Sequence, residues 1–242
     1  MDLYNTHIFS ILFLSLTLIT VRTQDDDIFS NLIDEGINPM QNLKADLYFL
    51  DNKVQPLGPE KVDIKLYYEC LCPDCRNFDT MSLRPTVEKL APYLNLHLYP
   101  YGNAQTIDKG NGVYDFVCQH GPAECYGNKL HACAIDYLGN MTKAVFFNSC
   151  MMESSRNDRG SNDEAADVCG KELNVDPTWI KQCAKGPRGN ALLKNYGDES
   201  ALVGFKFVPF ILINGVQKDD SNFMKEVCAT FKTPPPECAQ VV

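Results

Sequence analysis

The residues best suited to chemistry are two cysteines separated by two positions, in the segment Cys72-Pro-Asp-Cys75. A thiol at the first turn of a helix lies beside unpaired backbone N–H groups, and the helix dipole there stabilises its thiolate. Cys72 is therefore predicted to attack a substrate disulfide, and Cys75 to resolve the mixed disulfide that forms. A structural disulfide and a zinc half-site are the alternatives, and a position between a strand and a helix disfavours both.

Regular elements on both sides of this motif are expected to position it. Residues 62–68 alternate apolar and polar side chains and end in aromatic residues, which predicts a strand. A helix is expected from about Pro73 to Leu90, because proline fits the first helical turn, and a second strand over residues 94–99. The order strand, helix, strand predicts a parallel crossover unit.

The rest of the chain is expected to complete an α/β fold. Residues from about 103 to 201 combine helical fragments with cysteines and polar turns, which predicts a cysteine-rich helical insertion. Residues 206–214 predict a strand with Val208-Pro209 near its start, followed by a short strand at 216–217. A helix over 223–231 ends before a proline-rich tail, residues 234–242. These elements predict a thioredoxin-like domain over residues 61–233 that carries the insertion.

Composition limits the class of protein. Eleven cysteines in 242 residues are spread along the chain rather than arranged as repeated metal-ligand pairs, so no metal site is expected. This usage indicates an oxidising secretory compartment. A formal net charge of −9 argues against nucleic acid or an anionic membrane surface as the main partner.

The N-terminal segments agree with secretion. Residues 1–23 are predicted to be a signal peptide, because the apolar run over 8–21 is shorter than a membrane-spanning helix. An uncleaved anchor is the alternative, since Asp2 stands where signal peptides carry a basic residue. Residues 24–60 lack a sustained apolar period and are interpreted as a leader or propeptide. The sequon at Asn140 would be glycosylated in that pathway.

A second pattern, from Cys118 to Cys133, reads C-Q-H-G-x2-E-C-x2-N-x4-C. It resembles the signature of the gamma-interferon-inducible lysosomal thiol reductase (GILT) family, and the resemblance extends from about residue 62 to residue 238. It implies a thioredoxin-like fold, reduction of disulfides in partly unfolded proteins, an acidic endolysosomal or secreted setting, and trimming of the termini. His120 within the signature is interpreted as a structural hydrogen-bonding group in preference to a general base.

The fold resemblance also bears on a proline and on the other cysteines. In thioredoxin-like proteins a cis proline faces the dithiol and leaves the preceding backbone free to bind substrate, and Val208-Pro209 resembles that segment. Cys238 lies in the tail and could pair within the chain or link two chains as a homodimer. The candidates for structural disulfides, whose pairing the spacing leaves open, are Cys118, Cys125, Cys133, Cys150, Cys169, Cys183, Cys228 and Cys238.

Cys70 is the odd thiol, at a position where the family pattern usually has a small apolar residue. If the strand continues, it lies on the same side as Cys72 and could trap a mixed disulfide or tune that thiol. A buried, inert thiol is the favoured interpretation. A metal cluster of Cys70, Cys72 and Cys75 lacks an evident fourth ligand and is disfavoured.

The predicted function is reduction of protein disulfides at acidic pH, with a small thiol as electron donor and no bound cofactor. A net depression of the Cys72 pKa is expected, with Arg76 favouring it and Asp74 opposing it. The alternatives are a secretory disulfide oxidase or isomerase and a non-enzymatic secreted binding protein. Expected partners are disulfide-bonded, partly unfolded proteins, without nucleic acid and without stable membrane association after signal cleavage.

Overall fold

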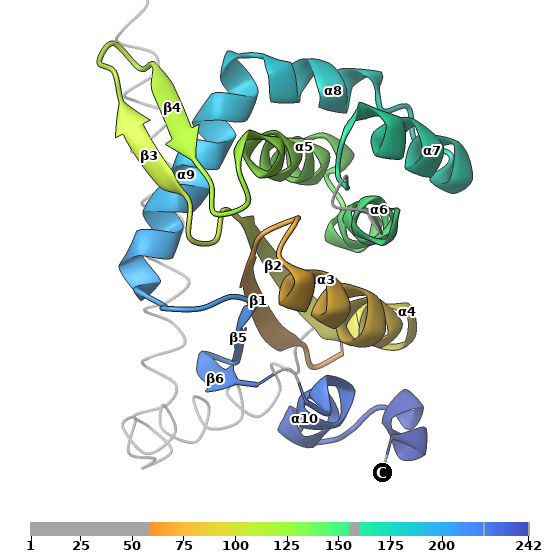
Figure 1. Ribbon diagram of the computed structural model, residues 1–242. Coiled ribbons are helices and arrows are strands. Elements are labelled where there is room, and N and C mark those ends of the chain that lie inside the picture. The colour runs from red at the N-terminus through yellow and green to blue at the C-terminus, as the bar shows by residue number, and fades with distance from the viewer. Residues whose placement is uncertain (1–58, 155–159, 220, 242) are drawn as a thin grey trace, which may run out of the picture. The chain divides into compact units, whose positions relative to one another are not determined.

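The computed structural model describes residues 59–154, 160–219 and 221–241. The predicted signal peptide and nearly all of the predicted leader lie outside these residues. In the described part, Figure 1 shows a central sheet with the strand order β2-β1-β5-β6, flanked by helices. Its strands are β1 (Val62–Tyr68), β2 (Leu94–Pro100), β5 (Phe210–Ile213) and β6 (Val216–Lys218).

The predicted parallel crossover is present at the centre of the sheet. β1 pairs in parallel with β2, from Val62 opposite Leu94 to Tyr68 opposite Pro100. On its other side β1 pairs antiparallel with β5, which pairs antiparallel with β6. The strand expected over 206–214 is shorter than predicted, because ladder pairing begins only after Pro209, which has no N–H to donate.

The helix expected from Pro73 to Leu90 is divided into three segments. A π-helical turn, η1 (Asp79–Leu83), lies between α3 (Pro73–Phe78) and α4 (Arg84–Leu90). Pro85 near the start of α4 cannot donate the usual bond to the preceding turn, and the wider turn comes directly before it. One consequence is that Asp79, in this turn, is buried.

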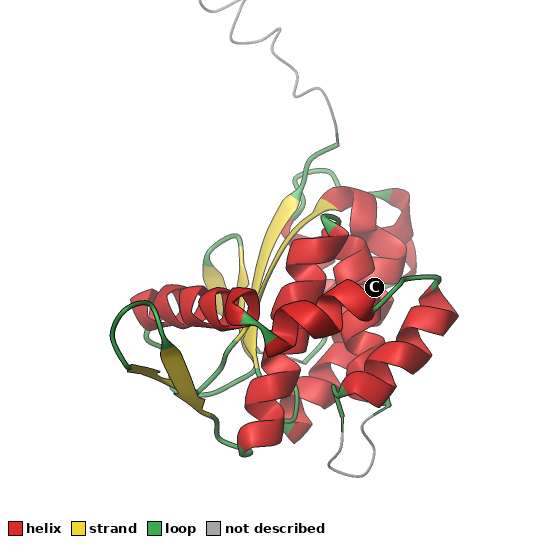
Figure 2. Cartoon of the chain, turned by 90° about the horizontal axis from the view of Figure 1, so that it is seen from above, coloured by secondary structure: helices red, strands yellow, loops and turns green. Residues whose placement is uncertain are grey.

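The two faces of the sheet carry different layers. Ile64, Leu66 and Tyr68 point to one face and share a core with Phe78 of α3 and Leu90 of α4. The alternate side chains point to the other face. There Tyr67 stacks on Tyr99 at 4.3 Å, and Tyr99 meets Tyr196 of α9 (Pro187–Val203) edge-on at 5.9 Å. Figures 1 and 2 accordingly show α9 on the side of the sheet away from α3 and α4.

Between β2 and β5 lies the insertion, which is mainly helical. It has its own core, built around Leu130, Phe147, Met151 and Ile180. Figure 1 shows its first four helices gathered together, and the second of them lies beside α3 and α4. Those helices are α5 (Pro122–Leu138), α6 (Met141–Glu153), α7 (Asp163–Leu173) and α8 (Thr178–Lys185).

The insertion begins with an antiparallel hairpin, so the expectation of helical fragments from residue 103 is wrong there. β3 (Gln105–Asp108) pairs with β4 (Tyr114–Val117). Gly110, Asn111 and Gly112 have positive φ between them, a conformation that glycine and asparagine adopt at least cost. The sequence signal was the Gly-Asn-Gly turn beside the alternating Tyr-Asp-Phe-Val.

After the sheet, the chain ends in α10 (Phe223–Thr230) and a short 3-10 helix, η3 (Pro236–Gln240). A disulfide joins Cys228 of α10 to Cys238 of η3, so Cys238 pairs within its own chain. In the part of the chain that the structure describes, no helix is both long and apolar enough to cross a membrane.

Candidate active site

The two cysteines of the CxxC motif lie at the N-terminus of α3. Cys72 is the N-cap residue with extended backbone, Pro73 is the first helical residue, and the backbone N–H of Arg76 donates to the Cys72 carbonyl at 3.0 Å. Both are free thiols, with Cys72 7% exposed and Cys75 1% exposed. The strand β1 ends just before them, so the sheet fixes one end of the motif and the helix the other.

The two thiols differ strongly in acidity. Hydrogen bonding from the Cys75 thiol, with help from the backbone N–H groups of Cys75 and Asp74, lowers the pKa of Cys72 to about 6, against the opposing effect of burial. Burial raises the pKa of Cys75 well above its usual value, and the hydrogen bond to Cys72 raises it further. Cys72 is thus the group that ionises first, and Cys75 keeps its proton. Asp74 opposes the ionisation of Cys72, as expected.

Val208 and Pro209 lie opposite the dithiol. The peptide bond between them is cis. The Cys72 thiol donates to the Val208 carbonyl oxygen across 4.0 Å, a long contact between groups far apart in sequence. Phe207, next to them, is 54% exposed. The backbone of Val208 therefore lies beside the Cys72 sulfur, and an exposed aromatic residue precedes Val208 in the chain.

A cavity of about 630 Å³ adjoins α3 on the side of Pro73. Its lining mixes charged and apolar groups, and Met81 within it is 71% exposed. The residues that contribute to it from α3, η1 and α4 include Pro73, Arg76, Asn77, Thr80, Met81 and Arg84.

The signature from Cys118 to Cys133 packs against the short segment that joins β1 to the dithiol. The side chain of Asn128 on α5 accepts a hydrogen bond from the Cys70 backbone N–H at 2.9 Å. The Cys70 thiol donates to the Glu124 carbonyl oxygen at 3.6 Å. Gly127 permits this close approach, since a Cβ there would lie 2.5 Å from the Cys70 sulfur. Cys70 is fully buried, and burial raises the pKa of its thiol well above the usual value.

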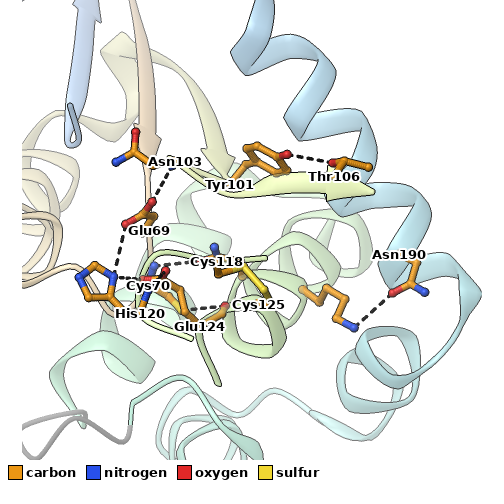
Figure 3. The surroundings of a disulfide bond; sticks show 12 residues. Glu69, Cys70, Tyr101, Asn103, Thr106, Cys118, His120, Glu124, Cys125 and Asn190 are labelled. Carbon is orange, nitrogen blue, oxygen red and sulfur yellow. Dashed lines mark hydrogen bonds and ion pairs between the residues drawn. A yellow bond between two sulfur atoms is a disulfide. The ribbon is translucent and has the colours of Figure 1, made fainter. Parts of the chain in front are cut away.

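His120 and Glu124 of the same signature meet Glu69, the residue before Cys70 (Figure 3). His120 Nδ1 lies 2.6 Å from Glu124 Oε2 and 3.5 Å from Glu69 Oε2. Both carboxylate side chains are fully buried, whereas the imidazole is 32% exposed. Gly121, which begins the helix that carries Glu124, has φ 84° and ψ −173°, a backbone conformation essentially confined to glycine.

Four disulfides hold this scaffold together. Cys118–Cys125 closes the loop that carries His120, as Figure 3 shows, and the others join elements of the insertion and of the C-terminus. The remaining pairs are Cys133–Cys183, Cys150–Cys169 and Cys228–Cys238. Asn140 is exposed and is the N-cap of α6, where its side-chain oxygen accepts from the Lys143 backbone N–H at 3.0 Å.

Sequence reasoning missed two buried acids near the dithiol. Glu69 follows the aromatic end of β1 and looks like the polar end of a strand, yet its side chain is enclosed by the signature loop. Asp79 directly follows α3 as the first residue of the π-helical turn η1, and it is buried there. An acidic residue within an otherwise apolar run was the only available signal for Glu69. Among the described residues, the three side chains Glu69, His120 and Glu124 form the one cluster with metal-ligand spacing.

Known proteins resemble this chain in sequence over most of its length. Residues 63–173 match the family described as gamma interferon inducible lysosomal thiol reductase (GILT). The gamma-interferon-inducible lysosomal thiol reductase of Carassius auratus is 37% identical over 190 residues, which are 74% of this chain and 72% of that protein. The protein of the same name from Mus musculus is 34% identical over 182 residues, 74% of this chain and 71% of its own length.

Solved structures agree on the fold. Oxidised BdbD from Bacillus subtilis superposes with a TM-score of 0.51 at 11% identity, over 70% of this chain and 86% of that one. The predicted thioredoxin-like α/β fold with a cysteine-rich helical insertion is therefore confirmed. By sequence, this chain belongs to the gamma-interferon-inducible lysosomal thiol reductase family of thiol-disulfide oxidoreductases.

Proposed function

We propose that this protein reduces protein disulfides under acidic conditions, with Cys72 as the nucleophile and Cys75 as the resolving thiol. The observation that carries the proposal is the unequal acidity of the two thiols at the start of α3. The pKa of Cys72 is lowered to about 6, whereas that of Cys75 is raised. A dithiol with one reactive thiolate and one retained proton has the two roles that disulfide reduction requires.

The reaction proceeds in two exchanges. The Cys72 thiolate attacks one sulfur of the substrate disulfide, forms a mixed disulfide and expels the other sulfur as a thiolate, which takes a proton from water. Cys75 then loses its proton and attacks the Cys72 sulfur, which releases the second substrate thiol and leaves a Cys72–Cys75 disulfide. Two electrons pass to the substrate. A small-thiol reductant returns the enzyme to the dithiol, and no bound cofactor takes part.

An acidic compartment is compatible with this chemistry. With a Cys72 pKa of about 6, about a tenth of the protein carries the thiolate at pH 5, roughly ten times the fraction for a thiol of pKa 7. The relatives named above are called lysosomal. We place this protein in the lysosome or endosome, or outside the cell, reached by the secretory pathway after removal of the signal peptide.

The substrates are partly unfolded proteins that carry disulfides. Phe207 and Met81 are exposed apolar side chains near the dithiol, and each suits an apolar segment that a folded protein would bury. The backbone of Val208 beside Cys72 and the cavity along α3 offer polar and apolar contacts to such a substrate. Small disulfides would reach the sulfur without these contacts.

One observation favours a second candidate, a disulfide oxidase or isomerase. A lowered nucleophile pKa stabilises the reduced enzyme and so raises the reduction potential of its disulfide. Equilibration of the protein with glutathione buffers decides between the two. A potential near that of thioredoxin supports the reductase, whereas one near −120 mV, as in a strong oxidant, supports the oxidase.

The direct test uses wild type, Cys72→Ser and Cys75→Ser with a denatured disulfide-bonded protein and a small-thiol donor, at pH 4.5 and pH 7. The wild type is expected to reduce the substrate at pH 4.5, and Cys72→Ser to be inactive. Cys75→Ser is expected to accumulate a mixed disulfide, visible on a non-reducing gel. Full activity of Cys72→Ser, or a mixed disulfide through Cys75, would refute the assignment of roles.

A further inference from the structure

The carboxylates of Glu69 and Glu124 are held in the same way. One oxygen of each accepts from a backbone N–H, at 2.5 Å from Asn103 to Glu69 Oε1 and at 2.9 Å from His120 to Glu124 Oε1. The second oxygen of each points to the same atom, His120 Nδ1 (Figure 3). The two carboxylates therefore compete for a single ring nitrogen.

That nitrogen can serve only one of them, because Nδ1 carries at most one proton. Its contact with Glu124 at 2.6 Å is a hydrogen bond, whereas Glu69 Oε2 at 3.5 Å is buried without a hydrogen-bond donor. An ionised carboxylate oxygen is disfavoured in such a place, and a protonated one is not. Burial accordingly raises the pKa of Glu69 to about 7. The Asn103 N–H and, as the smallest effect, the charge of His120 oppose the rise, and the charges of Glu124 and Cys72 reinforce it.

Glu69 is also linked to the dithiol. Its backbone hydrogen-bonds to the Cys75 sulfur and moderates the rise in that pKa, whereas its side-chain charge adds to the rise. Conversely, a negative charge on Cys72 raises the pKa of Glu69. The titratable groups that act on Glu69 or are acted on by it are His120, Glu124, Cys70, Cys72 and Cys75.

We propose that the signature loop serves to hold the Glu69 carboxyl in its protonated form beside the dithiol, which makes Glu69 a positioning residue that couples the reactivity of the two cysteines to pH. The inference rests on the proposed dithiol chemistry and adds a role for the signature. His120 engages Glu124 and so withholds its proton from Glu69. The Cys118–Cys125 disulfide and Gly121 fix the loop in the conformation that does so.

The coupling has a definite direction. In the acidic range Glu69 is neutral and leaves both thiols unaffected by its charge. Above neutral pH it ionises, and its negative charge makes it harder for Cys75 to lose a proton and attack the mixed disulfide. Above neutral pH, Cys75 therefore resolves the mixed disulfide more slowly than it would without a charge on Glu69.

The first experiment observes the proton directly. Infrared difference spectra of the reduced protein are titrated from pH 5 to pH 9 in an Asp79→Asn background, which removes the other buried carboxyl whose pKa is raised to about 7. That background alone is compared with the double variants that add Glu69→Gln or the exposed-site control Glu164→Gln. A carboxylic-acid C=O band is expected to persist to about pH 7 in the background and in the control, and to be absent when Glu69→Gln is added. Glu124→Gln frees the imidazole for Glu69 and is expected to move the band's midpoint to lower pH.

The second experiment measures the rate at which a mixed disulfide at Cys72, formed with a small aromatic disulfide, is resolved by Cys75. Glu69→Gln is expected to match wild type at pH 5 and to be faster by about three- to tenfold at pH 8, as expected for a coupling of up to one pKa unit.

Three results would overturn the inference. These are an Asp79→Asn spectrum without the band at pH 5 to 6.5, equal resolution rates of wild type and Glu69→Gln at pH 8, and stoichiometric Zn²⁺ binding that depends on Glu69. The infrared titration requires no turnover, so it can fail while Cys72-dependent reduction succeeds, and the reverse.

Discussion

The burial of the Asp79 carboxyl predicts that this protein becomes less stable as the pH rises from 4 to 7. Its side chain lies in the π-helical turn η1, the residue is 4% exposed, and Oδ2 has no hydrogen-bond partner. Burial raises its pKa from 3.8 to about 7, although the Ser149 hydroxyl and the Arg84 charge oppose the rise. The folded state therefore prefers the neutral acid, and the unfolded state prefers the ionised one above pH 4.

The sign and size follow from this difference. Because the folded pKa is the higher one, the stabilisation from proton binding is fully present below the unfolded pKa and is lost as pH rises through the folded value. A shift from 3.8 to about 7 corresponds to about 4 kcal/mol of unfolding free energy lost over that range. Asp79→Asn replaces the acid by a neutral side chain of nearly equal shape and should remove most of this loss.

The assay is urea unfolding at pH 4.5, 5.5, 6.5 and 7.5, with the disulfides intact, for wild type, Asp79→Asn and the exposed-site control Asp167→Asn. Asp79→Asn should be more stable than wild type at pH 7.5, by up to about 4 kcal/mol, and nearly equal to it at pH 4.5. Residual pH dependence in the variant would come from Glu69, whose raised pKa acts in the same direction. A difference that is constant with pH, or a wild type that gains stability toward pH 7, would refute the reasoning.

Three further predictions concern single side chains. Phe207→Ser should lower kcat/KM for a denatured protein substrate by about tenfold, as loss of one apolar contact implies, and leave reduction of a small aromatic disulfide unchanged; an equal loss on both would contradict a docking role. Thr142→Ala should abolish glycan attachment at Asn140 in a secreting cell, and a variant that differs from wild type only by the mass of the substitution would show that the exposed site is not used. Cys70→Ala should retain disulfide reduction, since its thiol is buried and bonded to a backbone carbonyl; loss of turnover in a stably folded variant would assign Cys70 a redox role.

The strands and helices around the dithiol could be predicted from the sequence, because they depend on local patterns of apolar and polar residues. The alternation of 62–68 and the Leu94-x-Leu-x-Leu pattern place one face of each strand in the core, and both strands form. The π turn at 79–83 could not be read in this way, because it depends on how one proline is accommodated within a packed helix. Disulfide pairing was equally undetermined, since the spacing of the cysteines does not show which of them the folded chain brings together.

The candidate site shows the same division. The dithiol and its position at a helix start follow from adjacent residues, whereas the buried state of Glu69 depends on a loop about fifty positions further along the chain. The sequence favours a structural role for His120, and in the structure its imidazole lies against the carboxylates of Glu124 and Glu69. The contact between His120 and Glu69 could not be predicted, because nothing in the sequence around His120 indicates which segment its loop packs against.

The two buried acids lead to one argument about the acidic setting. Asp79 and Glu69 belong to different elements and share no hydrogen bond, yet burial raises both pKa values to about 7. In both places the folded protein stabilises the neutral carboxyl over the charged one. Acidic pH therefore favours the stability of the fold at Asp79, and at Glu69 it removes the negative charge that hinders ionisation of the dithiol. A protein selected for neutral surroundings would gain from Asn and Gln at these positions. Protonated carboxyls at both positions are therefore compatible with the acidic working pH proposed above.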